Sequence, residues 1–487
     1  MAGIGTVTHN AAWLMGQRLV MGIFSVLVVA VVARYLGTEE YGHLVLLLSY
    51  NALLSQFASL GLRPYSVREM AARRSQLPSL LAEMLSLRMA LAFGVGGLAV
   101  PLLHWLDPLL PDPLLLVLAL QLVTNALAMV YLDGLYGLEA IKDVAKVLGT
   151  SGTAVQLASL AAVGLDAGLM GVAWAYVIGS LVTIAMGWSL VRARAGAIGP
   201  GRLRRASFRH VIDSRVFFFQ NIVHTIRQRL DIVIITSLGG AHAAGVYGAS
   251  LTLVQRLDTI QDALATALFP RVSSLQSGDR EELVELVRQI YKLVLVIALP
   301  LGVGLFGTAG SVVPLVFGRK FLDAGPVLAT LALAIPFSFA YGMLYNVMGA
   351  MGRQDTVFRC ALWALVPGLA GMAFAVHLAG PLGAAVAFVA IVAVLAVTLG
   401  WVYTRDVGRL ASAGDYARLL GANAAMGLLL AFGSGLHLAI LVPACMALYG
   451  LAVLAFRVIS PATVRSLLRR RKAEGPAVAP PREGGDA

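Results

Sequence analysis

Runs of about 20 apolar residues recur along the whole chain, separated by short segments rich in polar and charged residues. A helix of this length crosses the hydrocarbon core of a bilayer, so each run predicts one transmembrane segment. The first run has no basic flank and no small-residue cleavage site, and we expect a retained helix rather than a signal peptide. We predict fourteen segments, at 11–33, 42–61, 80–104, 113–133, 144–165, 169–191, 216–238, 243–270, 290–316, 325–350, 357–378, 382–404, 416–436 and 437–457.

The composition supports an all-α polytopic membrane protein. Of the 487 residues, 59% are hydrophobic and only 13% are charged, whereas soluble domains carry about a quarter charged residues. The net charge of +12 does not indicate a nucleic-acid partner, because the basic residues are spread over alternate short connections. With fourteen segments, 30 of the 37 Lys and Arg residues fall on the side of both termini. The positive-inside rule therefore predicts that both termini are cytoplasmic.

The chain contains an internal repeat. A shift of 212 residues places Asp143 on Asp355 and Gly168 on Gly380, and LGTEEYG (36–42) matches LGGAHAAGVYG (238–248) apart from four extra residues. Six helices followed by six equivalent helices predict a parallel pseudo-repeat, which is typical of transporters with a central site. We expect an N-terminal six-helix lobe (1–191), a basic cytoplasmic linker (192–215), a C-terminal six-helix lobe (216–404), two extra helices (405–459) and a basic, partly disordered tail (460–487).

Motifs for catalysis and nucleotide binding are missing from the sequence. GVGLFG (302–307) satisfies G-x-G-x-x-G, but it lies inside an apolar run with no strand before it, so we interpret it as helix packing. The sequence has no Walker A, HExxH or GxSxG motif. Cys360 and Cys445 lie in apolar surroundings and indicate neither a disulfide nor a metal site. We therefore predict no enzyme activity, no cofactor and no metal, and transport by this chain alone is not expected to use ATP.

The seventh run carries an unusual row of polar residues. Gln220, His224, Arg227 and Asp231 are spaced i, i+4, i+7 and i+11, so they share one helix face, while Arg229 points elsewhere. Polar groups facing lipid would be unsolvated, so this face should border a cavity or the bundle interior. Arg227 and Asp231 could instead form a structural ion pair that lets the helix insert.

Three other runs carry candidate site residues. Arg256 lies near the middle of the eighth run and has no acidic residue at i±3 or i±4. An Arg at that depth costs roughly 2.5–3.5 kcal/mol, which a ligand, water or a distant helix must offset. The first run adds Gln17 and Arg18, and the second adds Asn51; Arg18 could also snorkel to the interface. Since guanidinium groups suit phosphate, Arg18, Arg227 and Arg256 predict a cationic cavity for an anionic amphiphile.

The segment from Ala33 to Ala71, with its RYLG…YG turn and its GL…R ending, resembles the start of bacterial polysaccharide flippases. These form the O-antigen/exopolysaccharide branch of the MATE-like exporter superfamily. RLDIVIITSLGGAHAAGVYGAS (229–250) resembles the start of that family's second lobe, and the stretch 351–388 its tenth to twelfth helices. The resemblance implies alternating access and an undecaprenyl-diphosphate-linked oligosaccharide as substrate, moved from the inner to the outer leaflet of the bacterial cytoplasmic (inner) membrane. It also implies that Arg18 and Arg256 match the diphosphate-binding arginines of related lipid II flippases.

The sequence hypothesis is therefore a lipid-linked oligosaccharide flippase for cell-surface polysaccharide. Asp231 and His224 would orient Arg227 or respond to coupling protons. The expected partners are the polyprenyl-diphosphate-linked glycan, the lipid bilayer, and a polysaccharide polymerase with its chain-length machinery. Two alternatives remain open. One is a cation-coupled drug exporter, which the lack of an acidic residue in the first run disfavours; the other is an envelope assembly protein that transports nothing.

Overall fold

The computed structural model describes residues 4–106, 110–196, 207–275, 280–433, 435 and 437–456, and their regular structure is helical. Within these ranges the side chains of 4–21, 23, 106, 207–208, 220, 258–259, 262–271 and 273–275 lie outside the description. The expected tail (460–487) and the middle of the expected linker (197–206) are also outside it. The α-helices are α1 (Ile4–Ser59), α2 (Leu62–Ala72), α3 (Leu77–Leu106), α4 (Asp112–Gly137), α5 (Ile141–Gly164), α6 (Gly168–Ala195), α7 (Ser207–Leu275), α8 (Arg280–Phe317), α9 (Ala324–Ala332), α10 (Ile335–Ala350), α11 (Gln354–Asp406), α12 (Ala413–Phe432) and α13 (Leu438–Ala455).

The helices confirm a polytopic membrane fold. By length and hydropathy, eight helices in the described ranges can cross a membrane, or up to ten when each bent pair counts as one. Three of the long helices contain two predicted segments each: α1 is broken at Gly37, α7 at Gly240, and α11 at Ala379 and Gly380. Counting two segments in each of these three, and one in the bent pair of α9 and α10, gives about fourteen segments, as the hydropathy pattern predicts.

The breaks reveal the repeat in the backbone itself. Gly37 and Gly240 both have a left-handed φ, 77° and 80°, with an extended ψ. Residues other than glycine rarely adopt this backbone conformation. Gly168 and Gly380, which a 212-residue shift pairs in the sequence, also share a positive φ, 59° and 55°. Equivalent turns in the two halves therefore need the same special backbone, which confirms the parallel pseudo-repeat.

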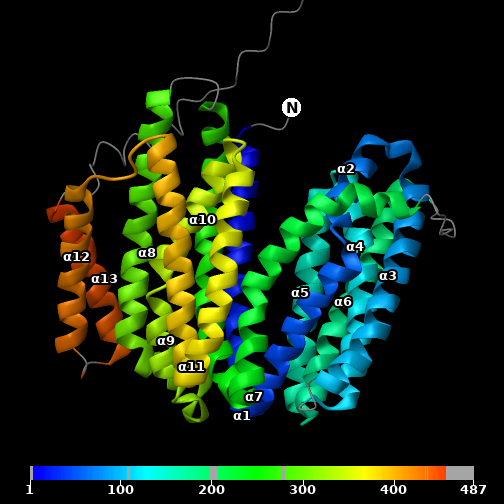
Figure 1. Cartoon of the computed structure of the whole chain (residues 1–487), viewed down its shortest axis with the longest axis horizontal. Coiled ribbons are helices and arrows are strands. Elements are labelled where there is room, and N and C mark those ends of the chain that lie inside the picture. The colour runs from blue at the N-terminus through cyan, green and yellow to red at the C-terminus, as the bar shows by residue number, and fades with distance from the viewer. Residues whose placement is uncertain are drawn as a thin grey trace, which may run out of the picture.

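Figure 1 shows two groups of helices that form a V. One group contains α2 to α6, and the other contains α8 to α13, with α12 and α13 at its outer edge. Helices α1 and α7 run between the groups and meet at the point of the V, while the lobes diverge toward the edge where α1 starts. We call the edge where α1 starts the N-terminal face and the edge at the point of the V the opposite face.

The lobes touch closely at the opposite face, just beyond the two glycine breaks. A Cβ on Gly42 would overlap the carbonyl oxygen of Ala241, and a Cβ on Gly245 would overlap that of Thr38. These contacts pair Gly42 with Gly245, as the breaks pair Gly37 with Gly240, so the shift here is 203 residues without an insertion. The sequence alignment of Leu36–Gly42 with Leu238–Gly248, with its four extra residues, is therefore wrong. The matching Tyr-Gly pairs place Gly42 on Gly248, whereas the backbone contacts place Gly42 opposite Gly245.

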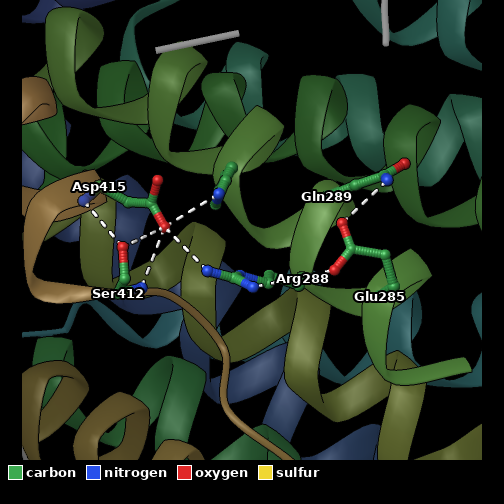
Figure 2. Close-up of polar contacts among 6 residues, drawn as sticks. Glu285, Arg288, Gln289, Ser412 and Asp415 are labelled. Atoms are coloured by element: carbon green, nitrogen blue, oxygen red, sulfur yellow. Dashed lines mark hydrogen bonds and ion pairs between the residues drawn. The ribbon is translucent and has the colours of Figure 1, made fainter. Parts of the chain in front are cut away.

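The two extra helices dock onto α8 through a polar cluster at the start of α12. Asp415 accepts hydrogen bonds from Ser412 in a capping box and lies 2.9 Å from Lys292 Nζ and 3.5 Å from Arg288 Nη2 (Figure 2). Farther along, the Tyr449 hydroxyl of α13 donates to the carbonyl oxygen of Val296, at 2.9 Å. Polar contacts thus fix both extra helices on one face of α8.

Candidate substrate cavity

Four adjoining cavities lie between the lobes. Two of them, the α10 cavities, have volumes of about 420 and 510 Å³ and lie between α7, α10 and α11. The α3–α4 cavity, about 380 Å³, lies between α1, α2, α3, α4 and α7, and the α5–α6 cavity, about 520 Å³, lies between α1, α5, α6 and α7. His224 lines both α10 cavities and the α3–α4 cavity, while Arg229 and Gln255 line an α10 cavity and the α5–α6 cavity. The cavities therefore share walls around α7, which occupies their centre.

His224 and Arg227 stand together in the α10 cavities, as their helical spacing predicts. The Arg227 guanidinium lies 5.6 Å from the ring centroid of Tyr341, a distance at which the ring face attracts a cation. Tyr345 and Asn346 of α10 complete this wall, and Tyr345 is half-exposed. The ring holds Arg227 in place while its hydrogen-bond donors stay available to a ligand.

Arg256 lines the α5–α6 cavity with Arg229, Thr252 and Tyr176. Arg229 was expected on a different face of the helix from Arg227, yet it lines the α10 and α5–α6 cavities at once. The cavities curve around α7, so a residue on its other flank still reaches them. Arg229 thus joins the group of arginines at the centre of the protein.

Asp231 does not border any of these four cavities. It is 2% exposed and accepts hydrogen bonds from the Tyr247 hydroxyl, at 3.0 Å, and from the backbone N–H of Ile232, at 2.8 Å. Tyr247 belongs to the part of α7 beyond the Gly240 break, which folds back beside Asp231. The carboxylate therefore ties the two parts of α7 together, and the expected stripe from Gln220 to Asp231 includes only His224 and Arg227 in the described cavity walls.

The remaining candidates lie apart from this group or outside the described side chains. Asn51 is 6% exposed and accepts a hydrogen bond from Ser55, at 3.4 Å, and it borders none of the four cavities. Gln17 and Arg18 lie on α1 and Gln220 lies on α7, but their side chains are not among those described. Their roles as cavity residues stay predictions.

The arrangement gathers three guanidinium groups in adjoining cavities. None of Arg227, Arg229 and Arg256 forms an ion pair with a described acidic side chain. No three His, Cys, Asp or Glu side chains among the described residues are placed to hold a metal ion. A water-filled cavity or an anionic ligand is what offsets such charges in a membrane protein.

The sequence of this scaffold matches a known family over most of its length. Residues 31–326, which contain α7 and all three arginines, match the polysaccharide biosynthesis protein family. The chain belongs to the polysaccharide biosynthesis protein family. It is similar to a Shigella flexneri protein named as a putative O-antigen transporter, with 28% identity over 200 residues. It is also similar to the teichuronic acid biosynthesis protein TuaB of Bacillus subtilis strain 168, with 27% identity over 141 residues.

These matches cover part of each relative. They span 39% of this chain and 47% of the Shigella protein, and 28% of this chain and 28% of TuaB. Among solved structures, the lipid II flippase MurJ in an inward closed conformation superposes with a TM-score of 0.73, covering 95% of this chain and all of MurJ at 13% identity. A multidrug resistance MATE transporter of the MOP superfamily superposes with a TM-score of 0.63, covering 80% of this chain and 97% of its own. The fold is thus that of MurJ and MATE transporters.

Two arginines of the α3–α4 cavity are not predicted as site residues by the sequence pattern. Arg63 and Arg88 line the α3–α4 cavity, although the distribution of basic residues places both on the side of the termini, Arg63 in a connection and Arg88 near the start of the predicted segment 80–104. Arg88 is 1% exposed and pairs with Asp133, 45 residues away in the sequence. No periodic spacing within one helix can reveal a pair that forms between two helices.

Proposed function

We propose that this protein flips an undecaprenyl-diphosphate-linked oligosaccharide across the bacterial cytoplasmic membrane, from the inner to the outer leaflet, for cell-surface polysaccharide synthesis. The observation that carries this proposal is the group of three arginines, with no ion pair to a described acidic side chain, in adjoining cavities of a membrane protein. A diphosphate offers several anionic oxygens to planar guanidinium groups, which bind it through paired, charge-assisted hydrogen bonds. Family membership and the similarity to a protein named for O-antigen transport support the same substrate class.

The residues that line the cavities suggest where each part of the substrate would bind. Arg227, Arg229 and Arg256 would hold the diphosphate, with His224 at the junction of three cavities as a further donor. Apart from its arginines, about half of the residues that line the α5–α6 cavity are valine or leucine, so it suits the end of the headgroup to which the polyprenyl chain is attached. The glycan would then extend into the cavities with polar walls.

The place where the lobes touch supports movement by alternating access. They pack tightly at the opposite face, around Gly42 and Gly245, and diverge toward the N-terminal face (Figure 1). If the termini are cytoplasmic, as the distribution of basic residues favours, the cavities are loaded from the inner leaflet. Parting of the lobes at the opposite face would then release the lipid to the outer leaflet.

The proposal is tested with Arg227→Ala, Arg229→Ala and Arg256→Ala in cells that lack the native gene. At equal protein level, each variant should deliver glycan to the outer leaflet at least about tenfold more slowly, since a charged hydrogen bond contributes roughly 1.5–3 kcal/mol. Arg319→Ala, an exposed arginine in the short 3-10 helix at Arg319–Phe321, is the matched control and should keep the wild-type rate. Wild-type delivery in all three cavity variants would refute the site.

The MATE-like fold makes a cation-coupled drug exporter the second candidate. Deletion of the gene separates the two functions, because loss of an exporter changes drug resistance and leaves surface glycan intact. A protein that only assists envelope assembly would tolerate Arg256→Lys and Arg256→Gln equally. A flippase needs the charge, so Arg256→Lys should retain more transport than Arg256→Gln.

A further inference from the structure

The α3–α4 cavity holds a second group of charges that the proposed diphosphate site does not use. Arg63 of α2 and Arg88 of α3 both line this cavity. Asp133 of α4 is fully buried, with its Oδ2 2.5 Å from Arg88 Nη2 and its Oδ1 3.4 Å from Arg63 Nε. Two guanidinium groups share one carboxylate, so this wall of the cavity keeps a net positive charge.

Neighbouring side chains fix the positions of both guanidinium groups. Arg88 is 1% exposed, and its Nε has no hydrogen-bond partner among the described residues. The Arg63 side chain is half-exposed, and its guanidinium lies 5.5 Å from the ring centroid of Tyr136, which fixes its position. Because the buried Arg88 is paired with Asp133, the excess charge lies on the half-exposed Arg63 guanidinium, where an anionic ligand in the cavity can reach it.

The rest of the cavity wall has the chemistry of a sugar site. Gln56, Asn125 and Asn221 bring amide groups that both donate and accept hydrogen bonds, and Ser55 and Ser59 bring hydroxyl groups. Sugar hydroxyls also act as donor and acceptor, so such side chains match them. The volume of about 380 Å³ lies within the size range of small-molecule sites.

The position of the cavity fits the covalent structure of the substrate. Asn221 and His224 line both the α3–α4 cavity and the adjoining α10 cavity that contains Arg227. In the proposed substrate the first sugar is bonded directly to the diphosphate, so it must lie in a cavity next to the phosphate site. Resting on the proposed function, we infer that the α3–α4 cavity binds the first sugars of the glycan and that Arg63 and Arg88 select a saccharide that carries a carboxylate.

A purely structural role of the cluster gives a different prediction. If Arg63, Arg88 and Asp133 only join α2, α3 and α4, loss of Arg63 lowers stability and leaves any preference among ligands unchanged. A selective role requires that loss of Arg63 affect only ligands with a negatively charged sugar. Arg63 is half-exposed, so its replacement leaves the Arg88–Asp133 pair in place.

The experiment measures binding to the purified full-length protein in lipid nanodiscs. Three probes are compared: undecaprenyl diphosphate, and undecaprenyl diphosphate linked to glucose or to glucuronate. The wild type should bind the glucuronate-linked lipid about tenfold more tightly than the glucose-linked lipid. Arg63→Gln should abolish that preference and leave the affinity for the other two probes unchanged. Arg68→Gln is the matched control, since Arg68 lies on the same helix, is exposed and contacts Glu69 and the Tyr65 ring rather than the cavity.

The three probes separate the two proposals. Equal wild-type affinity for the two sugar-linked lipids overturns the sugar subsite, and so does a uniform loss of affinity for all three probes in Arg63→Gln. Failure of the wild type to bind undecaprenyl diphosphate at all overturns the proposed function instead. A preference that survives in Arg63→Gln also refutes the assignment to this cluster.

Discussion

Gly42 of α1 and Gly245 of α7 pack reciprocally, each against a backbone carbonyl of the other helix, at the point where the two lobes meet. Neither position has room for a Cβ, because the nearest atoms belong to backbone that cannot rotate away. The closed contact at the opposite face therefore depends on the absence of two side chains. The same contact must open for the lobes to part on that face.

Gly42→Ala or Gly245→Ala should push the lobes apart at the opposite face. Overpacking costs typically about 1–3 kcal/mol, so the closed arrangement should lose roughly tenfold or more in population. Labelling of cysteines introduced beside the contact should then become faster. Gly22→Ala on the same helix α1 is the control, because no atom lies within 4 Å of a Cβ built there. Unchanged labelling in both glycine variants would contradict the reciprocal contact.

Arg34 provides a second closure at this face. Its Nε donates to the carbonyl oxygen of Val316, at 2.9 Å, and its Nη2 donates to that of Leu315 at the end of α8. A cation at a helix C-terminus is also favoured by the helix dipole. Arg34→Ala should favour the state that is open at the opposite face, whereas Arg34→Lys keeps the charge and should shift it less. Double electron–electron resonance distances across the two lobes measure the shift, and identical distance distributions in all three proteins would contradict it.

The cluster at the start of α12 should stabilise the protein in a pH-dependent way. Partial burial alone raises the pKa of Asp415, but hydrogen bonds from Lys292 and Ser412 outweigh it and hold this pKa below its usual range. A carboxyl group with a lowered pKa stabilises the fold above its unfolded pKa, about 4 for Asp, and the benefit disappears as the pH falls through its folded pKa. Asp415→Asn should therefore lower the thermal unfolding midpoint at pH 7.

The cost of Asp415→Asn should shrink as the solution is acidified below about pH 4, because the Asp415 carboxyl group of the unfolded chain is then partly protonated while that of the folded protein is still ionised. Glu285→Gln is the matched control. Glu285 is more exposed and contacts Arg288 at 3.8 Å and Gln289 at 3.0 Å on its own helix (Figure 2). Its loss should change the midpoint little, as surface ion pairs contribute about 0–1 kcal/mol. Equal midpoint changes in the two variants would argue against a special role of Asp415.

Tyr247→Phe should separate structure from transport. The change removes the hydroxyl that donates to the buried carboxylate of Asp231, which should destabilise the protein by about 1–3 kcal/mol. Transport per folded molecule should stay near the wild-type value, because neither residue borders the cavities. Tyr345→Phe is the comparison, since its half-exposed ring lies in the cavity wall and its loss of a hydroxyl should not change stability. A large transport defect in folded Tyr247→Phe would restore Asp231 to the site.

The fold was predictable because its signals are local. Apolar runs, basic connections and turn glycines such as Gly168 and Gly380 each act over a few residues, and their periodicity survives in the helices. The site was predictable only in part. Helical spacing locates His224 and Arg227, but the surroundings of Asp231 depend on the Gly240 break, which brings Tyr247 beside it. Spacing along one helix does not show which residues lie opposite each face after the chain reverses direction.

The 203-residue shift that pairs Gly37 with Gly240 identifies the positions of the first half that correspond to the cavity arginines. Applied to Arg227, Arg229 and Arg256, it leads to Phe24, Val26 and Leu53 in the first half. The two halves thus share the glycine breaks, but the positions that correspond to the three cavity arginines are apolar in the first half. In the proposed cycle the diphosphate would be held by arginines of the second half, while the first half contributes Arg63 and Arg88 to the adjoining α3–α4 cavity.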